Sequence, residues 1–450
     1  MKKLLMILMS VMMVFALVGC SSSGGSSDTP AEDAVLYVGS TAVSESGDVL
    51  GDGTVTYDKD TNTLTLNNAT IDAGANKVSV FFSGGSYEEV DGTITYCGEA
   101  DLNVVLEGDN KLVSGEGTYT AGIVMVQYLA DKDQYNFDYA ETAALNISGN
   151  GSITMDGYSL AGILTAESGD INMDGIKYVL DADTYYGIYG GAFVNAKDSE
   201  ISVNTAHFGI SAGGGYTNDN TVVAMDNTGT GIESSGYGVT VNSGSISVTN
   251  SDLGVGGTMV TMNAGTIVVS DCTTGIAGEF ITFNGGYTDI NNPLGAGIYS
   301  TSEVFINGGG VDVVSCDIAI ETNIIDITGG ETTITSNESM AMYCHGILVG
   351  FGNDAFNMSG GKLEATAVDY PAICGLTGYN LADTLSVDEP VDGKISAGFV
   401  DEAPDTQIFA FTEGSESELT DILVYTSSVD GQVMISITNI GNAARHVMVK

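Results

Sequence analysis

Between residues 187 and 342 the chain repeats a small residue followed by an aliphatic one about every 22 residues. These pairs are Gly187-Ile188, Gly209-Ile210, Gly231-Ile232, Gly254-Val255, Gly275-Ile276, Gly297-Ile298, Ala319-Ile320 and Ala341-Met342. Weaker pairs extend the pattern at Gly122-Ile123, Gly162-Ile163 and Ala372-Ile373. A fixed period of this size is typical of a solenoid, in which a repeat buries its apolar face only by stacking on a neighbour.

Within one repeat, short runs of alternating apolar and polar residues are separated by turn residues. Residues 260–277 contain runs rich in Thr, Val and Ile, divided by Gly, Asn and Asp. This alternation with a period of two predicts strands and not helices. The sequence therefore predicts an all-β fold, a right-handed parallel β-helix over residues 31–384 with three strands in each coil of about 22 residues.

A second set of polar residues ends a strand in successive repeats, usually just before a glycine. Polar side chains stacked at one turn can bond each other from coil to coil and hold the register. The members of this set are Asn242, Asn263, Asn284, Asn307, Thr328 and Ser359.

The repeat fades after residue 385. Residues 385–450 keep strand-like runs at 407–411, 422–425 and 433–437. An open solenoid end would expose unpaired strand edges. We therefore expect residues 385–450 to form a small C-terminal β cap.

The N-terminus predicts export. Lys2 and Lys3 precede an apolar run over residues 4–18, which is the order of regions in a signal peptide. The run closes with Leu17-Val18-Gly19-Cys20, which resembles the lipobox of bacterial lipoproteins. That resemblance implies that residues 1–19 are a lipoprotein signal peptide and that Cys20 is lipidated. The Ser/Gly-rich residues 20–30 are then a flexible tether, and we expect a protein lipid-anchored to the extracytoplasmic face of the cell membrane, at the bacterial cell surface.

The charge of the chain narrows its partners. It has 58 acidic and 12 basic residues and a net charge of −46, which disfavours nucleic acid and anionic lipid headgroups. The acids either serve solubility or bind divalent cations such as Ca²⁺. Asp289 and Asp312 fall at equivalent outward positions of neighbouring coils, so that two like charges stack. We take Asp289 and Asp312 as a candidate metal site with Ca²⁺ as its cofactor.

The cysteines do not form a metal-binding motif. With Cys20 lipidated, five remain, and Cys272 and Cys316 occupy equivalent positions two coils apart. A separation of about 9.6 Å is too large for a disulfide. We expect the remaining cysteines, Cys97, Cys272, Cys316, Cys344 and Cys374, to be buried thiols that pack as small hydrophobic residues.

Three segments carry a resemblance to a known family. They run from Tyr57 to Ile71, from Leu102 to Leu112 and from Leu145 to Ile153. Together they resemble the opening of bacterial surface β-helix proteins known as carbohydrate-binding-domain proteins, which are similar in fold to pectate lyases. The likeness covers about residues 50–380 and implies a β-helix that binds polysaccharide or cell-surface glycan. The matching positions are core and turn residues, so no sugar-binding residue is transferred.

The alternation predicts which side chains could contact a glycan. If the aliphatic residues of the repeat point inward, the next residue points to solvent. Tyr299, Glu321 and Tyr343 hold that position on consecutive coils, at steps of about 4.8 Å. Tyrosine rings stack on sugars and a carboxylate accepts hydroxyl hydrogen bonds. The sequence therefore predicts carbohydrate binding by this stripe.

Two interruptions of the repeat, at residues 123–162 and 341–372, hold extra residues. Insertions loop out of a solenoid and often build its binding face. The first insertion carries Tyr135 and Tyr139 among acids, which predicts further sugar stacking. The second places its extra residues near 345–354.

Catalysis is less well supported than binding. Pectate lyases resemble one another in using Ca²⁺ with a basic residue, often Arg, and the one Arg of this chain is Arg445, outside the repeat. Carboxylate pairs can still flank a glycosidic bond. The sequence favours a non-catalytic, lipid-anchored solenoid that binds glycan. The alternatives are a structural stalk or protein adhesin, and a polysaccharide lyase or hydrolase of pectate-lyase-like fold.

Overall fold

The structure is a computed structural model that describes residues 36–74, 76–82, 86–126, 143–165, 169–315, 317–345, 354–376, 378–389, 394–400, 403–412, 419–429 and 432–450. The chain folds as an all-β parallel β-solenoid of about 10 turns. It divides into two compact units, residues 1–240 and 241–450, called unit 1 and unit 2. In the described ranges, no segment is a helix long and apolar enough to span a membrane.

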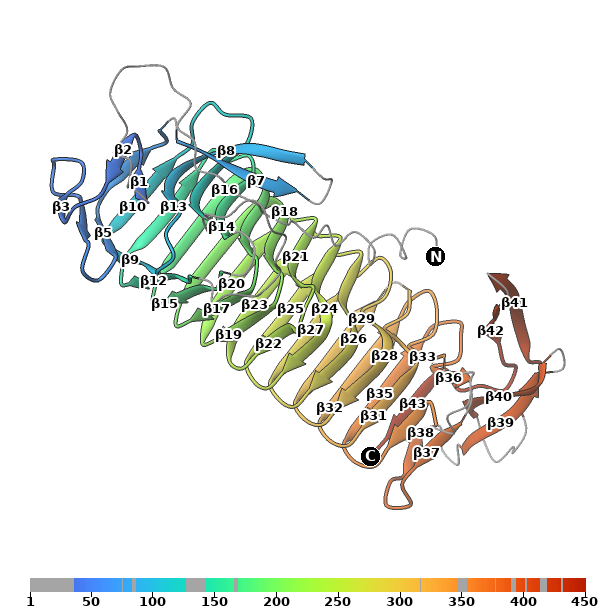
Figure 1. The fold of residues 1–450 in the computed structure, drawn as a ribbon. Coiled ribbons are helices and arrows are strands. Elements are labelled where there is room, and N and C mark those ends of the chain that lie inside the picture. Colours follow the sequence, from blue (N-terminus) through green and yellow to red (C-terminus); the bar gives the residue numbers. More distant parts are fainter. Residues whose placement is uncertain are drawn as a thin grey trace. The chain divides into compact units, whose positions relative to one another are not determined.

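In unit 1 the chain winds through three parallel sheets, which we call the ladder sheet, the second sheet and the third sheet (Figure 1). The ladder sheet holds the repeated Gly/Ala-aliphatic pairs and consists of β8 (Ser86–Tyr96), β11 (Thr120–Met125), β14 (Ala161–Thr165), the C-terminal parts of β16 (Lys177–Gly190) and β18 (Glu200–Ala212), and β21 (Thr230–Ser234). The second sheet consists of β5 (Thr63–Asn67), β9 (Leu102–Glu107), β12 (Leu145–Gly149), β15 (Ile171–Asp174), β17 (Phe193–Lys197) and β19 (Gly215–Asp219). The third sheet consists of β6 (Thr70–Asp72), β10 (Asp109–Val113), β13 (Ser152–Asp156), the N-terminal parts of β16 and β18, and β20 (Thr221–Asp226).

Antiparallel pairs involve β1 (Leu36–Val38), β2 (Thr41–Val43), β3 (Gly47–Asp48), β4 (Val55–Asp58) and β7 (Lys77–Phe82). Strand β22 (Gly238–Val241) spans the boundary of the units.

Unit 2 repeats the same three-sheet arrangement. Its ladder sheet consists of the N-terminal parts of β24 (Leu253–Met262), β26 (Thr274–Phe283) and β28 (Ile298–Ile306), followed by β30 (Ile320–Thr322), β33 (Met342–Cys344) and β36 (Ile373–Leu376). Its second sheet consists of the C-terminal parts of β24, β26 and β28, followed by β31 (Ile324–Ile327), β34 (Phe356–Met358) and β37 (Tyr379–Leu381). Its third sheet consists of β23 (Gly244–Thr249), β25 (Thr266–Ser270), β27 (Tyr287–Asn291), β29 (Gly310–Ser315), β32 (Glu331–Ser336) and β35 (Lys362–Ala367).

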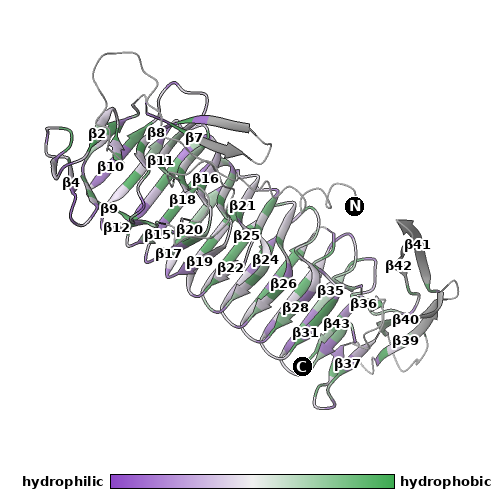
Figure 2. Cartoon of the chain, viewed as in Figure 1, coloured by the Kyte–Doolittle hydropathy of each residue, from purple (hydrophilic) through white to green (hydrophobic). Residues whose placement is uncertain are grey.

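The aliphatic residues of the repeat form the core, and the predicted register is confirmed. In unit 1 Ile188 pairs with Ile210 on the adjacent coil, and in unit 2 Ile276 pairs with Ile298, which neighbours Ile320. All five side chains are fully buried. Burial of one such side chain contributes about 1.5–3 kcal/mol to folding. Figure 2 shows the hydrophobic positions gathered along the strands.

The predicted ladder of polar side chains is also present in unit 2. The Nδ2 of Asn263 donates to Oδ1 of Asn242 at 2.8 Å, and Asn284 and Asn307 each donate to the preceding asparagine at 2.9 Å. The hydroxyl of Thr328 donates to Asn307 at 2.9 Å. These bonds link five consecutive coils at one turn and oppose slippage of their register.

Unit 1 has an asparagine ladder that the sequence analysis missed. It lies within the second sheet, where Asn146 donates to Asn103 at 3.1 Å, and Asn172 and Asn195 each donate to the preceding asparagine at 2.9 Å. The available signal was an asparagine between two buried aliphatic residues, as at Leu145-Asn146-Ile147. It was overlooked because it lies inside strands and not at a turn.

The C-terminal segment adds antiparallel strands to unit 2. They are β38 (Val387–Glu389), β39 (Lys394–Val400), β40 (Ala403–Thr412) and β43 (His446–Val449), with a separate hairpin of β41 (Leu423–Val429) and β42 (Gln432–Asn439). Strand β40 pairs with β36, and β43 pairs with β35. The outermost parallel strands of these two sheets therefore have hydrogen-bonded neighbours. That residues 385–450 act as a cap, and that the coil is right-handed, stay predictions.

The cysteines follow the sequence analysis in part. Cys272, Cys344 and Cys374 are buried free thiols, as expected. Burial raises the pKa of each thiol above its usual value, which favours the neutral form. The expectation is wrong for Cys97, which is buried but disulfide-bonded. The sequence argument excluded a disulfide only between Cys272 and Cys316, because these two occupy equivalent coil positions. It did not address whether Cys97 forms a disulfide.

Candidate functional site

A cavity of about 470 Å³ opens on the outer face of the second sheet in unit 2. Its lining is mainly polar and includes three carboxyl and two carboxamide side chains. The lining residues are Glu303, Ile324, Asp326, Ile327, Thr328, Asp354, Asn357, Met358, Ser359 and Asn380. This volume lies in the range of small-molecule sites, about 300–1,000 Å³.

The coil register brings the polar lining residues together. Asp326 on β31 pairs with Asn357 on β34, which pairs with Asn380 on β37. The residues on either side of Asp326 and of Asn357 are buried in the core, so these two side chains point outward. Phe305 on β28 extends the same row by one coil and is partly exposed. The row therefore offers one aromatic and three hydrogen-bonding side chains at steps of about 4.8 Å.

Asp354 reaches the cavity from the second predicted interruption of the repeat. Its carboxylate lies over Gly378, where a Cβ atom would come within 2.2 Å of Oδ1. The side-chain amide of Asn357 donates a hydrogen bond to the backbone carbonyl of Asp354 at 2.8 Å and fixes the start of β34. One residue of this interruption, Asp354, thus lines the cavity, while residues 346–353 lie outside the described ranges. That the interruption builds a binding face stays a prediction.

Glu303 and Asp326 form a hydrogen-bonded carboxyl pair inside the cavity. Burial, then the hydrogen bond with Asp326 and its negative charge, raise the pKa of Glu303 from 4.5 to about 7. The protonated Glu303 can donate to the Asp326 carboxylate, which keeps two acids in contact. Among the lining residues that the structure describes, every ionisable side chain is acidic, Asp354 included.

The raised pKa of Glu303 predicts a pH-dependent stability. Because the pKa is raised in the folded state, the stability from its proton is fully present below about pH 4.5 and is lost as the pH rises through about 7. Glu303→Gln keeps a donor but does not titrate. We expect this variant to unfold about 2 °C above the parent at pH 8 and at the same temperature at pH 5.

Thermal unfolding by circular dichroism at both pH values measures this effect. Glu279→Gln is the matched control, because Glu279 is an exposed carboxylate of unit 2 outside the cavity. Its effect on the unfolding temperature at each pH measures the removal of an exposed carboxylate alone. A shift for Glu303→Gln of the same size at pH 5 and pH 8 would contradict the role given to the proton of Glu303.

The predicted stripe of Tyr299, Glu321 and Tyr343 has the expected register but not the expected exposure. Tyr299 pairs with Glu321, which pairs with Tyr343. Tyr299 and Glu321 are partly exposed, whereas Tyr343 is only 3% exposed. The expectation that Tyr343 faces solvent is therefore wrong. Its ring points out of the coil but is covered by Ile408, Ile437 and Ile440.

Glu321 has a partner that the sequence analysis did not identify. Its carboxylate lies 2.7 Å from Nε2 of His345, whose ring contacts Tyr343 at a centroid distance of 4.4 Å. Because the imidazole already holds this carboxylate oxygen, Glu321 is a weaker candidate for sugar contact than predicted. The carbohydrate-binding role of these residues stays a prediction.

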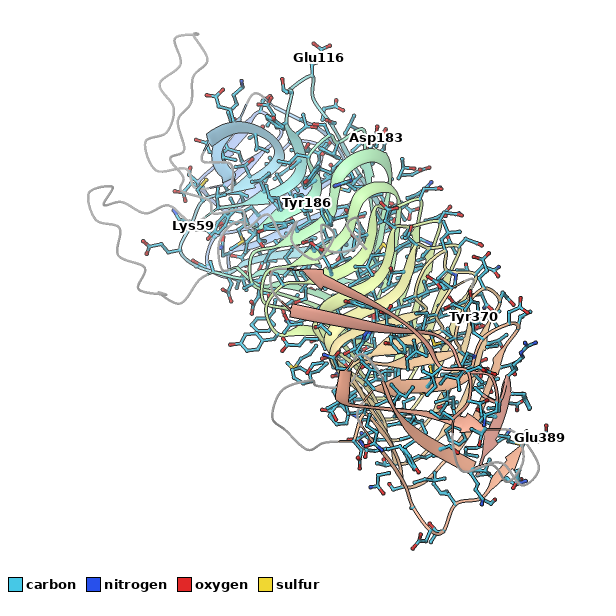
Figure 3. The ribbon with its side chains drawn as sticks, turned by 90° about the vertical axis from the view of Figure 1, so that its right-hand side faces the viewer. Lys59, Glu116, Asp183, Tyr186, Tyr370 and Glu389 are labelled. Atoms are coloured by element: carbon cyan, nitrogen blue, oxygen red, sulfur yellow. The ribbon has the colours of Figure 1, made fainter. Side chains whose placement is uncertain are left out.

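Outward-pointing tyrosines are also buried on the ladder sheet of unit 1, as Tyr343 is in unit 2. Tyr186 and Tyr189 lie outside the coil but are 4% and 7% exposed, because they pack with Val78 and Val90. Figure 3 shows Tyr186 among other side chains over the strands, whereas Glu116 and Asp183 point away from the ribbon. Outward direction along a strand therefore does not imply exposure in this fold.

Asp289 and Asp312 lie side by side on β27 and β29, as predicted. Each carboxylate accepts a hydrogen bond from a neighbouring side chain, from Asn291 at 2.6 Å and from the hydroxyl of Tyr287 at 2.5 Å. These donors reduce the repulsion between the two charges. Within the described ranges, no group of three or more His, Cys, Asp or Glu side chains is arranged to hold a metal ion. Binding of Ca²⁺ by Asp289 and Asp312 stays a prediction.

Four of the predicted residues lie outside the described ranges. They are Cys20, the predicted lipidation site, Tyr135 and Tyr139 of the first insertion, and Cys316, which was expected to be a buried thiol.

Comparison of the chain with known protein families, curated proteins and solved structures finds no match. The family resemblance in the sequence is therefore supported only by the parallel β-solenoid. Its carbohydrate-binding part stays an expectation.

Proposed function

We propose that this protein is a non-catalytic glycan-binding β-solenoid whose ligand occupies the cavity between Glu303 and Asn380. The main support for this proposal is the cavity lining, in which carboxyl, carboxamide and hydroxyl groups surround a space of about 470 Å³. Sugar hydroxyls donate to carboxylates and accept from amides, so a ligand rich in hydroxyl groups matches this lining.

The row from Phe305 to Asn380 favours a polymer over a single sugar. Hydrogen-bonding side chains recur on successive coils, and the ring of Phe305 begins the row. A flat aromatic ring can stack on a pyranose, while the following acid and amides bond its neighbours along the chain. The acidic lining favours a neutral polysaccharide over a polyuronate, because none of the described lining residues is basic and could pair with a ligand carboxylate.

The carboxyl pair favours binding over hydrolysis. Glycoside hydrolases separate their two carboxyl groups by about 5–5.5 Å or 6.5–9.5 Å, to leave room for the sugar or for water. Glu303 and Asp326 are in direct hydrogen-bond contact, which is closer than either arrangement. The pair therefore serves as a hydrogen-bonding surface in this proposal.

The proposed location follows from the N-terminal sequence. A basic start, an apolar run and the segment ending at Cys20 support export and lipid anchoring, and the net charge of −46 disfavours nucleic acid as a partner. Glycan at the cell surface is the partner accessible to such a protein. Labelling with a radioactive fatty acid, compared between the parent and Cys20→Ala, tests the anchor.

A glycan array with the purified chain, followed by titration of each neutral hit, tests the function. We expect Asp326→Asn and Asn357→Ala to weaken binding about tenfold or more, because each removes a hydrogen-bonding partner of the ligand. Glu279→Gln, outside the cavity, should bind as the parent does.

Three outcomes would contradict the proposal. Unchanged affinity in both cavity variants, together with a loss in Tyr299→Ala, would move the site to the ladder sheet. New reducing ends or unsaturated products would show an enzyme. No binding to any glycan would favour a structural stalk or protein adhesin.

A further inference from the structure

Two aromatic side chains of unit 1 are stacked on each other at the surface. Phe193 is 37% exposed and Tyr237 is 69% exposed. Their ring centroids are 5.6 Å apart and their planes differ by 19°. Each ring covers one face of the other, and the exposure of Tyr237 leaves much of its ring open to solvent. None of the sites described above includes these residues.

The ring of Phe193 packs on the backbone of two glycines of the adjacent coil. Phe193 begins β17 and pairs with Gly215 on β19. A Cβ atom on Gly215 would lie 3.1 Å from two ring carbons of Phe193, and one on Gly214 would lie 3.3 Å from another. The ring therefore lies against the backbone of these glycines. The backbone amide of Phe193 donates to Oδ1 of Asp170 at 3.1 Å, which puts a carboxylate beside Phe193 on the coil that precedes it.

The turn that carries Tyr237 is hydrogen-bonded to one of these glycines, Gly214. The carbonyl of Gly214 accepts two hydrogen bonds from this turn, from the hydroxyl of Ser234 at 2.9 Å and from the backbone amide of Tyr237 at 2.5 Å. The amide of Gly238 donates to the Ser234 hydroxyl at 3.1 Å. These bonds fix the backbone on both sides of Tyr237, so little conformational entropy is lost when a ligand binds its ring.

The size and charge of this surface select its ligand. An aromatic side chain buries about 150–250 Å² in full, so two partly exposed rings offer on the order of 200 Å². A specific protein interface needs about 800 Å² from each partner. One sugar ring matches the smaller area. The neighbouring Asp170 carboxylate and the net charge of −46 disfavour an anionic ligand.

We propose that Phe193 and Tyr237 form a second glycan-binding site, which stacks the apolar face of a neutral pyranose on the outer face of Tyr237. Phe193 is a positioning residue that supports Tyr237 from behind. The ligand class rests on the proposed function, but the residues are separate from the cavity of unit 2.

The absence of tryptophan from the chain allows a direct test. Tyr237→Trp introduces one indole, which can also stack on a sugar. Its fluorescence is titrated in the full chain with neutral hexasaccharides of β-1,4-linked glucose, xylose and mannose. We expect a shift of the emission to shorter wavelength with at least one of them. No shift with any of the three would overturn the proposal.

Affinity measurements give a second readout. For a sugar that shifts the emission, Tyr237→Ala should weaken binding about tenfold and Phe193→Ala somewhat less, whereas Tyr237→Phe should bind as the parent does. Val222→Ala, at an exposed apolar residue of the same unit, is the control. Unchanged affinity in Tyr237→Ala would overturn the proposal. So would a dimer of the parent that Tyr237→Ala abolishes in sedimentation, because the rings would then bind protein.

Variants of the two proposed glycan sites can be tested independently of each other. Combining Tyr237→Trp with Asp326→Asn should leave the emission shift intact. A shift that persists while the cavity variants bind normally would contradict the cavity and support the Phe193 and Tyr237 site. Loss of binding in the cavity variants with no emission shift would contradict this second site alone.

Discussion

Phe356→Ala should lower the free energy of unfolding of unit 2 by about 3–5 kcal/mol, because it removes a fully buried ring. The ring centroid of Phe356 lies 6.2 Å from that of Phe409 and 5.9 Å from that of Phe411. Both partners belong to β40 and are fully buried. The substitution would therefore leave a cavity between a parallel coil and the C-terminal antiparallel strands.

Chemical denaturation and amide hydrogen exchange would measure this loss. The exchange of β36 and β40 should accelerate most, because their pairing depends on the packing of this core. Phe280→Ala is the matched control at a partly exposed phenylalanine of the same unit, and it should cost less than about 1 kcal/mol. An equally small effect for Phe356→Ala would mean that residues 385–450 contribute little to the stability of the coils.

Gly297→Ala should destabilise unit 2 by about 1–3 kcal/mol through overpacking. A Cβ atom at Gly297 would lie 2.3 Å from Cγ1 of Val313 and 2.7 Å from the carbonyl oxygen of Ala319. Val313 is fully buried in the core, and the carbonyl oxygen of Ala319 accepts a backbone hydrogen bond from Ile298, so neither neighbour can move freely. The glycine is required here because the backbone of one coil approaches the backbone of the next.

Gly295→Ala is the control for this prediction, since Gly295 lies two residues earlier on the same coil. The nearest atom to a Cβ at Gly295 is the Thr273 carbonyl oxygen at 3.1 Å, so its cost should stay below about 1 kcal/mol. Unfolding midpoints in urea compare the two variants. Equal midpoints would show that packing against the next coil does not decide the residue type at position 297.

The two proposed glycan sites differ in how the coil builds them. The cavity uses side chains of successive coils on one sheet, so its length follows the number of coils that contribute. The Phe193 and Tyr237 site uses one strand and one turn, joined by glycines that leave room for the rings.

Much of the cavity could have been read from the sequence. Glu303 and Asp326 are one coil apart, Asp326 and Asn357 each lie between two buried residues of the second sheet, and Asn380 pairs with Asn357 on the next coil. The extra residues before Asp354 hid this row, because they break the regular spacing between Asp326 and Asn357. Phe193 and Tyr237 gave no such signal, since they meet through a turn and not through strand pairing.

The strands, the coil register, the buried aliphatic core and the asparagine ladder of unit 2 could all be predicted from the sequence. All of these depend on residues within one coil or on the coil next to it, so a period and an alternation describe them. The tertiary structure decided which outward residues remain exposed. Tyr343 is buried by Ile408, Ile437 and Ile440, and Tyr186 by Val78 and Val90. These covering segments are far away in the sequence, and only the folded chain brings their apolar side chains onto the outer face of the coil.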